Sequence, residues 1–379
     1  MVSVLFIVAV TALAIVVSDT LMCRVYQRDS TGLDFQYDDP SIGRSITKCL
    51  GLFGTVGIIG LLYWLFPEYH EDYYKPFFDI LNYVVPAWLL LAFPYIYLTD
   101  RHMRKPHDTY WQIGRAILGD WRALHGEELS QFALGWLVKG FFIPLMTKFM
   151  WDDVRFISTL DLSTLNSFPH WFDFLLSNLY FTDVGLALVG YIVTLRLTDT
   201  HLRSTEPTMV GWVVALECYP PFWTAIFSVD YLSYDRGLTW GTWLWNYPAL
   251  YSVWGMAILI LTGIYLWATI AFGARFSNLT YRGLITTGPY RYCKHPAYLT
   301  KNLSWWMISV PFLAVDSWQE AARHSILLLC VNVVYYLRAK TEERHLRRYP
   351  EYVQYMNWIG QSGLIGRINR FRLELLRGN

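Results

Sequence analysis

Charged residues are scarce in this chain. Asp, Glu, Lys and Arg together make up 16% of its 379 residues, whereas a soluble domain usually carries about 25%. Hydrophobic residues make up 54%, and the mean hydropathy is +0.26. Such a composition argues against a water-soluble globule and against intrinsic disorder. We therefore expect a chain that lies mostly in lipid.

An excess of charge of one sign and a cysteine framework are also absent. The 31 basic and 30 acidic residues nearly cancel, so no general basic field would attract nucleic acid. The cysteines form no close pair, which predicts free thiols rather than a disulfide scaffold or a thiolate metal site. These five are Cys23, Cys49, Cys218, Cys293 and Cys330.

Histidine-rich metal motifs are missing as well. His102 and His107 have a spacing that occurs in membrane di-iron enzymes, but those enzymes need further histidine boxes. None of the other histidines forms an adjacent pair. We therefore expect no metal site.

Long hydrophobic runs, by contrast, are abundant. A membrane helix needs about 20 mostly apolar residues, and the clearest segments contain VVPAWLLLAF and AILILTGIYLWATIAF. The span at 2–18 lacks a basic stretch before it, so we expect it to be a retained helix rather than a cleaved signal peptide. The predicted spans are 2–18, 46–66, 79–99, 131–150, 173–195, 209–229, 247–273, 296–315 and 323–340.

The loops between these spans differ in charge. Arginine and lysine are far more frequent in the loops that lie in the cytoplasm if the N-terminus is outside. The positive-inside rule therefore favours about nine spans, with the N-terminus outside and the C-terminus in the cytoplasm. The predicted fold class is an all-α, polytopic integral membrane protein.

The chain divides into two predicted parts. Residues 1–205 form N-terminal membrane helices that match no known type. Within them, the amphipathic stretch WQIGRAILGDWRAL in the cytoplasmic segment 100–130 predicts an interfacial helix, or else a connecting helix packed on its neighbours. Residues 206–379 form a core with the cofactor site and a C-terminal tail.

Charges and prolines inside the spans carry two further predictions. Lone charges within a bilayer are costly, so we expect Lys139 to pair with Asp183 or Glu217. Pro220 and Pro221 predict a break in the sixth helix.

Polar and aromatic residues are concentrated in two stretches near the C-terminus. GLITTGPYRYCKHPAYLTKNLSWW (283–306) follows the seventh span, and RAKTEERHLRRYPEYVQYM (338–356) follows the ninth. A hairpin with a loop of about seven residues separates them, and so short a loop makes antiparallel neighbours. We therefore expect His295 to lie close to Glu342 and Glu343 at one membrane face.

These stretches combine cationic, acidic and aromatic side chains. A nucleoside with an amino-acid arm would suit such a set, and the alternative is an ordinary basic loop that binds lipid headgroups. The side chains are Arg291, Lys294, His295, Glu342, Glu343, Tyr290, Tyr292 and Tyr298.

The two stretches together resemble the isoprenylcysteine carboxyl methyltransferase family, whose C-terminal arrangement phosphatidylethanolamine N-methyltransferases share. The pattern is G-P-Y-R-Y-x-K-H-P-x-Y, then R-x-x-x-E-E-x-x-L and Y-x-x-Y, and it covers roughly 250–360, under a third of the chain. The matching residues are Gly288, Pro289, Tyr290, Arg291, Tyr292, Lys294, His295, Pro296, Tyr298, Arg338, Glu342, Glu343, Leu346, Tyr352 and Tyr355.

The resemblance implies S-adenosylmethionine bound from the cytoplasmic side, and a membrane lipid or lipidated acceptor that enters from the bilayer. It implies that Arg338, Glu343 and His295 are the catalytic residues. The cofactor-binding residues that it implies are Gly288, Pro289, Tyr290, His295, Pro296, Tyr298, Leu299, Glu342 and Glu343.

The chain departs from the family pattern at two places. Thr300 stands where the family often has Gly or Ser, and Tyr349-Pro350 stands where a Gly is common. A larger residue at 300 could change how closely the helix approaches the cofactor. The acceptor therefore stays open among isoprenylcysteine, a phospholipid amine, a quinone-like or sterol-like lipid and a small hydrophobic thiol.

Two alternatives compete with a methyltransferase. A membrane reductase of the sterol-reductase type would bind NADPH in a similar layout, but a 2′-phosphate would prefer Arg or Lys over Glu342 and Glu343. A non-catalytic lipid-binding or transport protein with an inactive cofactor site is the other.

Overall fold

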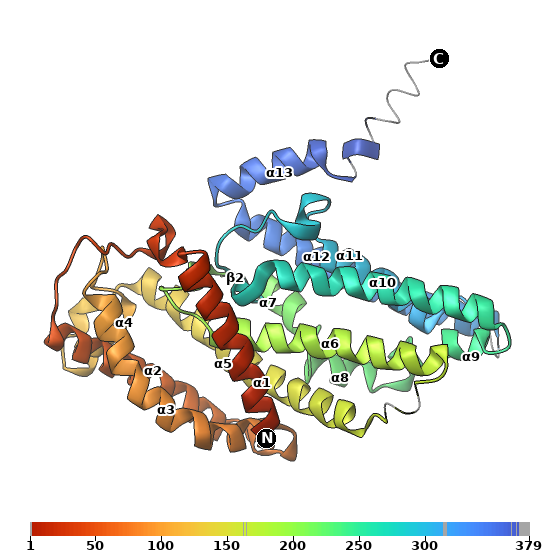
Figure 1. Cartoon of the computed structure of the whole chain (residues 1–379), viewed down its shortest axis with the longest axis horizontal. Coiled ribbons are helices and arrows are strands. Elements are labelled where there is room, and N and C mark those ends of the chain that lie inside the picture. The colour runs from red at the N-terminus through yellow and green to blue at the C-terminus, as the bar shows by residue number, and fades with distance from the viewer. Residues whose placement is uncertain are drawn as a thin grey trace. The chain divides into compact units, whose positions relative to one another are not determined.

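The computed structural model describes residues 2–161, 163, 165–313, 317–364, 366–368 and 370. Over these residues the chain is nearly all helical (Figure 1), as predicted, and its five cysteines are free. The last two residues of the predicted span 296–315 and the end of the tail lie outside the described residues. The helices are α1 (Val2–Val17), α2 (Ile42–Leu65), α3 (Lys75–Asp100), α4 (Thr109–Ile117), α5 (Gly126–Thr159), α6 (Phe168–Ile192), α7 (Met209–Leu216), α8 (Phe222–Phe227), α9 (Trp240–Leu244), α10 (Pro248–Phe272), α11 (Pro296–Ser309), α12 (Trp318–Leu346) and α13 (Pro350–Ser362).

Two compact units make up the chain. Unit 1 comprises Met1–Arg155, Val184–Pro207 and Gly273–Gly283, and unit 2 comprises Phe156–Asp183, Thr208–Phe272 and Leu284–Asn379.

Six helical segments in the described part of the chain are long and apolar enough to cross a membrane. They correspond to the first five predicted spans and the seventh, so a multi-pass membrane protein is confirmed. The total of nine spans and the orientation of the termini stay predictions. The segments are Val2–Met22, Ile42–Leu65, Asp72–Asp100, Gly126–Thr159, Phe168–Ile192 and Pro248–Arg275.

The other three predicted spans do not meet these criteria. The prediction of one helix over 209–229 is wrong, because α7 and α8 are separate short helices with the predicted break at Pro220–Pro221 between them. Helix α11 ends at Ser309, since Val310 is left-handed (φ 36°) and Pro311 follows it. Helix α12 is long enough, but polar and charged residues near both of its ends shorten its apolar stretch.

In unit 1, glycines let α2 and α4 approach closely (Figure 1). A Cβ on Gly51 would lie 1.9 Å from the Tyr110 carbonyl oxygen, and a Cβ on Gly114 would lie 1.9 Å from that of Thr47. Only glycine fits such a crossing. Helix α4 is thus packed on a neighbour, as one alternative predicted. Its interfacial placement stays a prediction, and exposed Ile117, Leu118 and Trp121 agree with it.

A buried guanidinium binds backbone carbonyls elsewhere in unit 1. Arg282, 2% exposed, follows the short antiparallel pair β1 (Ser204–Thr205) and β2 (Thr280–Tyr281). It donates hydrogen bonds to four backbone carbonyls within unit 1, so its donors and the end of α6 satisfy each other. The acceptors are Thr200 (2.6 Å), Gly190 (2.6 Å), Phe276 (3.0 Å) and Val193 (2.7 Å).

Lys139 is also satisfied inside unit 1. Its ammonium donates to the Thr194 hydroxyl at 2.7 Å and lies 4.6 Å from the Trp136 ring centroid. A hydroxyl and an aromatic ring are thus the contacts of Lys139 within unit 1, and the expected ion pair with Asp183 or Glu217, which belong to unit 2, stays a prediction.

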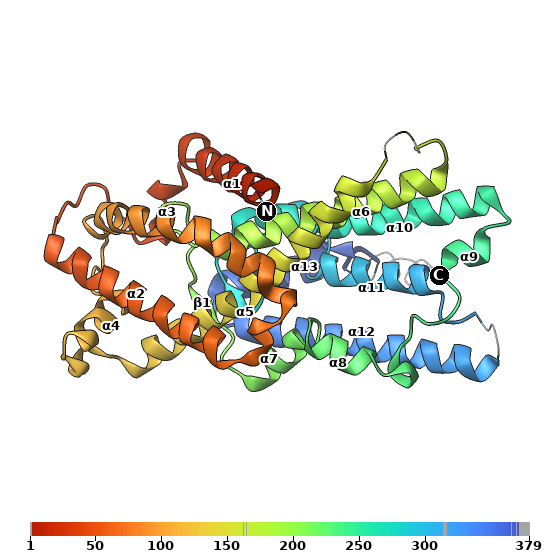
Figure 2. The same cartoon turned by 90° about the horizontal axis from the view of Figure 1, so that it is seen from below.

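In unit 2, α11 lies between α10 and α12 (Figure 2). Apolar side chains from α6, α9 and α10 form one core together with Val310, and Leu328, Val331 and Tyr335 of α12 form another with Tyr234. This packing holds the start of α11 and the end of α12 in a fixed relation.

Candidate functional site

The loop before α11 is shaped by two Pro-containing turns. A short 3₁₀ turn (Gly288–Arg291) begins at Gly288 with φ +59°, a conformation that suits glycine. His295 caps α11, and Pro296 takes the first helical position, where its missing N–H costs nothing. Helix α13 holds the loop from outside, because the Tyr355 hydroxyl donates to the Tyr290 carbonyl at 2.7 Å.

Glu343 is the centre of the polar cluster that this loop forms with α12. Its side chain is 4% exposed. Lys294 donates to its Oε1 at 2.6 Å, and His295 Nε2 lies 3.3 Å from the same oxygen. Lys340 and Arg347 lie 3.5 and 3.7 Å from Oε2. A buried carboxylate is tolerated here because cationic groups surround it.

Glu342, by contrast, faces partly outward with a 34% exposed side chain. It accepts a hydrogen bond from the Tyr298 hydroxyl, and His295 Nδ1 lies 3.7 Å from its Oε2. The imidazole thus lies between the two carboxylates. Its ring stacks on that of Tyr298, with centroids 5.5 Å apart and planes 2° from parallel.

Arg338 lies one helical turn before this acidic pair and is 4% exposed. Its guanidinium carbon lies over the rings of Tyr219 (5.7 Å), Tyr298 (5.2 Å) and Tyr335 (5.6 Å). Guanidinium groups bind aromatic faces by cation–π attraction. Through Tyr298, Arg338 joins the cluster around His295.

The electrostatics of the cluster favour an ionised Glu343. Hydrogen bonds from His295 and Lys294 hold the pKa of the Glu343 carboxyl well below its usual range, against an opposing effect of burial. Burial, together with the Glu342 charge, raises the pKa of Tyr290, which therefore stays a neutral phenol.

Most of the residues predicted for the site come together. His295 lies beside Glu342, Glu343 and Tyr298, and the Tyr298 hydroxyl donates to Glu342. Gly288, Pro289 and Tyr290 form the turn before them, and Pro296 is buried at the helix start. Leu299 is different, because its side chain is half exposed (50%) and its link to the cluster is a backbone one, from its N–H to the His295 carbonyl at 3.1 Å.

Thr300, the departure from the family pattern, is buried. Its hydroxyl donates to the Pro296 carbonyl at 3.0 Å, so it is satisfied within its own helix. The substitution adds bulk to α11 without adding a free polar group.

Sequence reasoning missed two of the three aromatic partners of Arg338, Tyr335 and Tyr219. Tyr335 precedes Arg338 by three residues on α12, a spacing that places two side chains on one helix face, and this signal was available. Tyr219, which lies in the loop after α7, gave no such signal.

Comparison of the chain with curated proteins and with solved structures gave no match. A comparison with protein families did, and the matched segment contains the whole cluster from Gly288 to Tyr355. The C-terminal part of the chain, residues 253–358, matches the model of the Isoprenylcysteine carboxyl methyltransferase (ICMT) family.

Proposed function

We propose that this chain is a membrane methyltransferase that moves a methyl group from S-adenosylmethionine to a lipid or lipid-modified acceptor. The family match supports the reaction class. The observation that carries the proposal is the position of His295 between the carboxylates of Glu342 and Glu343, which joins two stretches far apart in the chain.

The donors and acceptors of this cluster suit S-adenosylmethionine. The methyl donor carries an ammonium group, ribose hydroxyls and a carboxylate, which need acceptors and donors close together. Glu342 is partly exposed, and the buried Oε2 of Glu343 accepts no hydrogen bond from the described residues. Lys294, 31% exposed, supplies a donor for a carboxylate.

The two glutamates have different roles in this proposal. Glu343 is buried and held by Lys294 and His295, so it organises the loop. Glu342 is more exposed and is the carboxylate that contacts the ligand. Tyr298 connects both roles, since its hydroxyl holds Glu342 while its ring stacks on His295.

The chemistry demands alignment more than proton transfer. S-adenosylmethionine supplies an electrophilic methyl group on a sulfonium, and the sulfur leaves neutral, so no general acid is required. The residues of the cluster hold and orient the reactants. Such alignment can lower the activation barrier by about 7 kcal/mol in favourable cases. Arg338, with Tyr298 and Tyr335, lies beside the cluster and orients the acceptor. The cluster faces the cytoplasm in this proposal, as the basic loops predict.

A methyl-transfer assay tests the proposal. The full chain in membranes is incubated with S-adenosylmethionine labelled in its methyl group, and label is measured in the extracted lipids. We expect label in the lipid fraction, reduced at least about 10-fold by Glu342→Gln, which removes a charge-assisted contact.

Glu320→Gln is the matched control, because Glu320 is an acid on the same helix, at its opposite end. It should leave the transfer unchanged. Absence of label in the lipids of wild-type membranes, or equal loss in both variants, would contradict the proposal.

A further inference from the structure

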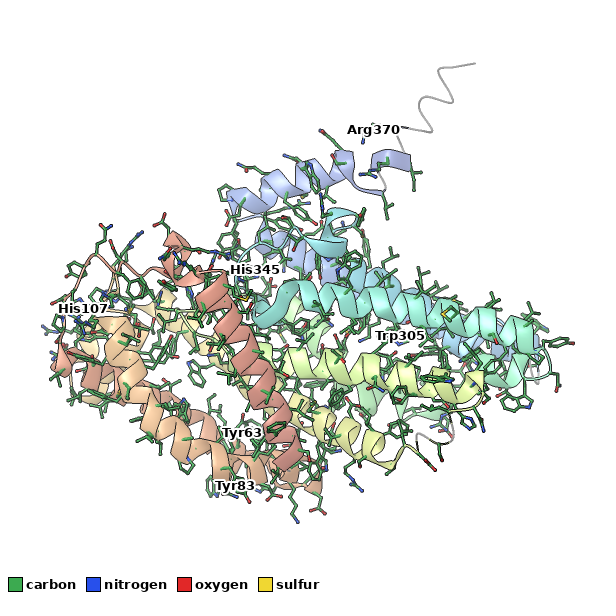
Figure 3. All side chains as sticks on the ribbon, viewed as in Figure 1. Tyr63, Tyr83, His107, Trp305, His345 and Arg370 are labelled. Carbon is green, nitrogen blue, oxygen red and sulfur yellow. The ribbon has the colours of Figure 1, made fainter. Side chains whose placement is uncertain are left out.

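Lys301 lies inside unit 2 among aromatic rings. It is two residues beyond Leu299 on α11, and its ammonium nitrogen lies 5.3 Å from the ring centroid of Tyr265, 5.3 Å from that of Trp305 and 5.9 Å from that of Tyr335. We call these three rings the aromatic box. Trp305 is labelled in Figure 3.

The ammonium in this box lacks hydrogen-bond acceptors. Among the described residues, Lys301 Nζ donates no hydrogen bond and forms no ion pair. Its cation–π contacts are with the three rings of the box. Cation–π attraction is worth about 0.5–1 kcal/mol at an exposed site and about 2 kcal/mol or more at a desolvated one, and it leaves the N–H donors without acceptors. An ammonium group has three N–H donors, and those of half-buried Lys301 are open to an acceptor on a ligand.

A second cation makes the arrangement less favourable without a ligand. Arg338 shares the Tyr335 ring with Lys301, at 5.6 Å, and the two positive charges repel each other. Two like charges that face one aromatic ring favour an anion near both.

The nearby acid does not fill this need. Asp183 attracts Lys301 electrostatically, but its two oxygens accept hydrogen bonds from the hydroxyls of Tyr265 and Thr269, each at 2.5 Å. Asp183 therefore balances charge at a distance, while the donors of Lys301 stay available.

We propose that Lys301 binds an anionic group of the methyl acceptor, a carboxylate or a phosphate, within the aromatic box, and so helps to determine which lipid is methylated. This inference rests on the proposed function. The rings of Tyr265, Trp305 and Tyr335 would contact the apolar part of the acceptor next to its charge, and Arg338 would contribute the second cation.

Equilibrium binding of three prenyl probes tests the proposal. The full chain in lipid nanodiscs is titrated with farnesyl phosphate, S-farnesyl-N-acetylcysteine and uncharged farnesol. We expect the wild type to bind at least one anionic probe about 10-fold more tightly than farnesol, because a charge-assisted hydrogen bond forms. Preference for the phosphate, the carboxylate or both identifies the source of the anion.

Variants of Lys301 test whether this residue causes the preference for anionic probes. Lys301→Met should bring the ratio between anionic probe and farnesol to about one, and Lys301→Arg should retain most of it. If Lys301→Met does not fold, Lys301→Gln takes its place. Lys139→Met is the matched control, because Lys139 also lies against a ring but has a hydroxyl partner. It should keep the wild-type ratio.

Two results would overturn the inference: equal affinity of the wild type for all three probes, or an anion preference that survives Lys301→Met. Titration with S-adenosylhomocysteine separates this failure from that of the proposed function. All Lys301 variants should keep its wild-type affinity, whereas a wild type that does not bind it contradicts the methyltransferase itself.

Discussion

Arg282 in unit 1 and Lys301 in unit 2 are both cations inside the protein, yet their surroundings are opposite. Arg282 donates to four backbone carbonyls within unit 1. Lys301 faces three rings and donates no hydrogen bond among the described residues. Arg282 uses most of its donors on the backbone and so stabilises the fold, whereas the donors of Lys301 are open to the ligand that we propose.

The two glutamates of unit 2 repeat this contrast at short range. Glu343 is surrounded by cationic groups and is 4% exposed, while Glu342 is 34% exposed and held mainly by Tyr298. Position in the sequence does not separate them, since they are neighbours. Their environments predict that a substitution of Glu343 will mainly lower stability and that a substitution of Glu342 will mainly weaken ligand binding.

The largest expected effect is on unit 1. Arg282→Met leaves four buried carbonyls without donors, which should lower the free energy of unfolding by about 4 kcal/mol or more. Thermal unfolding in detergent measures the loss. Arg282→Lys should recover only a small part, because one ammonium cannot reach all four carbonyls. If Arg282→Met were as stable as the wild type, Arg282 would not be the stabilising cation that the comparison with Lys301 assumes.

Glu343→Gln should have the next largest effect. The substitution replaces the charge-assisted contacts that Lys294 and His295 make with the buried carboxylate by weaker neutral ones, at a cost of about 2 kcal/mol. The melting temperature of the full chain should fall clearly, with a smaller fall for Glu342→Gln. Equal melting temperatures for the two variants would show that Glu343 does not organise the loop.

Ligand affinity should reverse the order of the two variants. Glu342→Gln should weaken S-adenosylhomocysteine binding about 10-fold while the protein stays folded, since a charge-assisted contact is lost. For the fraction of Glu343→Gln that remains folded, the loss should be smaller. Calorimetric titration at a temperature where both variants are folded provides the comparison. A stronger loss in Glu343→Gln would move the ligand contact to Glu343.

The pH dependence of stability tests the role of Glu343 in the fold. Its lowered pKa means that the folded state favours the carboxylate, so its contribution is complete above the ordinary glutamate value of 4.5 and is lost as the pH falls below it. Melting temperatures between pH 7 and pH 3 should therefore decline more steeply for the wild type than for Glu343→Gln. Parallel curves would contradict this assignment.

The smallest effect is expected for a polar side chain between the helices of unit 2. Asn332 accepts from the Trp306 indole at 2.7 Å and donates to Asn302 at 2.6 Å, so α11 and α12 are linked. Asn332→Leu should cost about 1 kcal/mol and leave S-adenosylhomocysteine affinity unchanged. A large loss of affinity would show that this link positions the site.

The meeting of His295 with Glu342 and Glu343 was predictable, because it depends only on a short hairpin and helix direction. Six of the spans were predictable because an apolar run of about 20 residues has the length and composition of a membrane helix. The break within 209–229 was located at Pro220–Pro221, but two short helices replaced the expected kinked span.

Other features depend on packing that no local pattern contains. The box around Lys301 needs Tyr265 of α10 beside α11 and Tyr335 of α12, which is a matter of register between helices. Charge complementarity predicts an acid beside Lys139, but it gives no sign of its contacts within unit 1, the Thr194 hydroxyl and the Trp136 ring. Leu299 shares the motif but not the cluster, because its position on α11 leaves it half exposed.

Calorimetric titration of the wild-type protein with S-adenosylhomocysteine and, separately, with NADPH tests the central claim most directly. The cluster of His295, Glu342 and Glu343 predicts binding of S-adenosylhomocysteine and none of NADPH, whose 2′-phosphate would meet two carboxylates. Binding of NADPH alone would contradict the account and favour a membrane reductase, and binding of neither would favour a lipid-binding protein without catalysis.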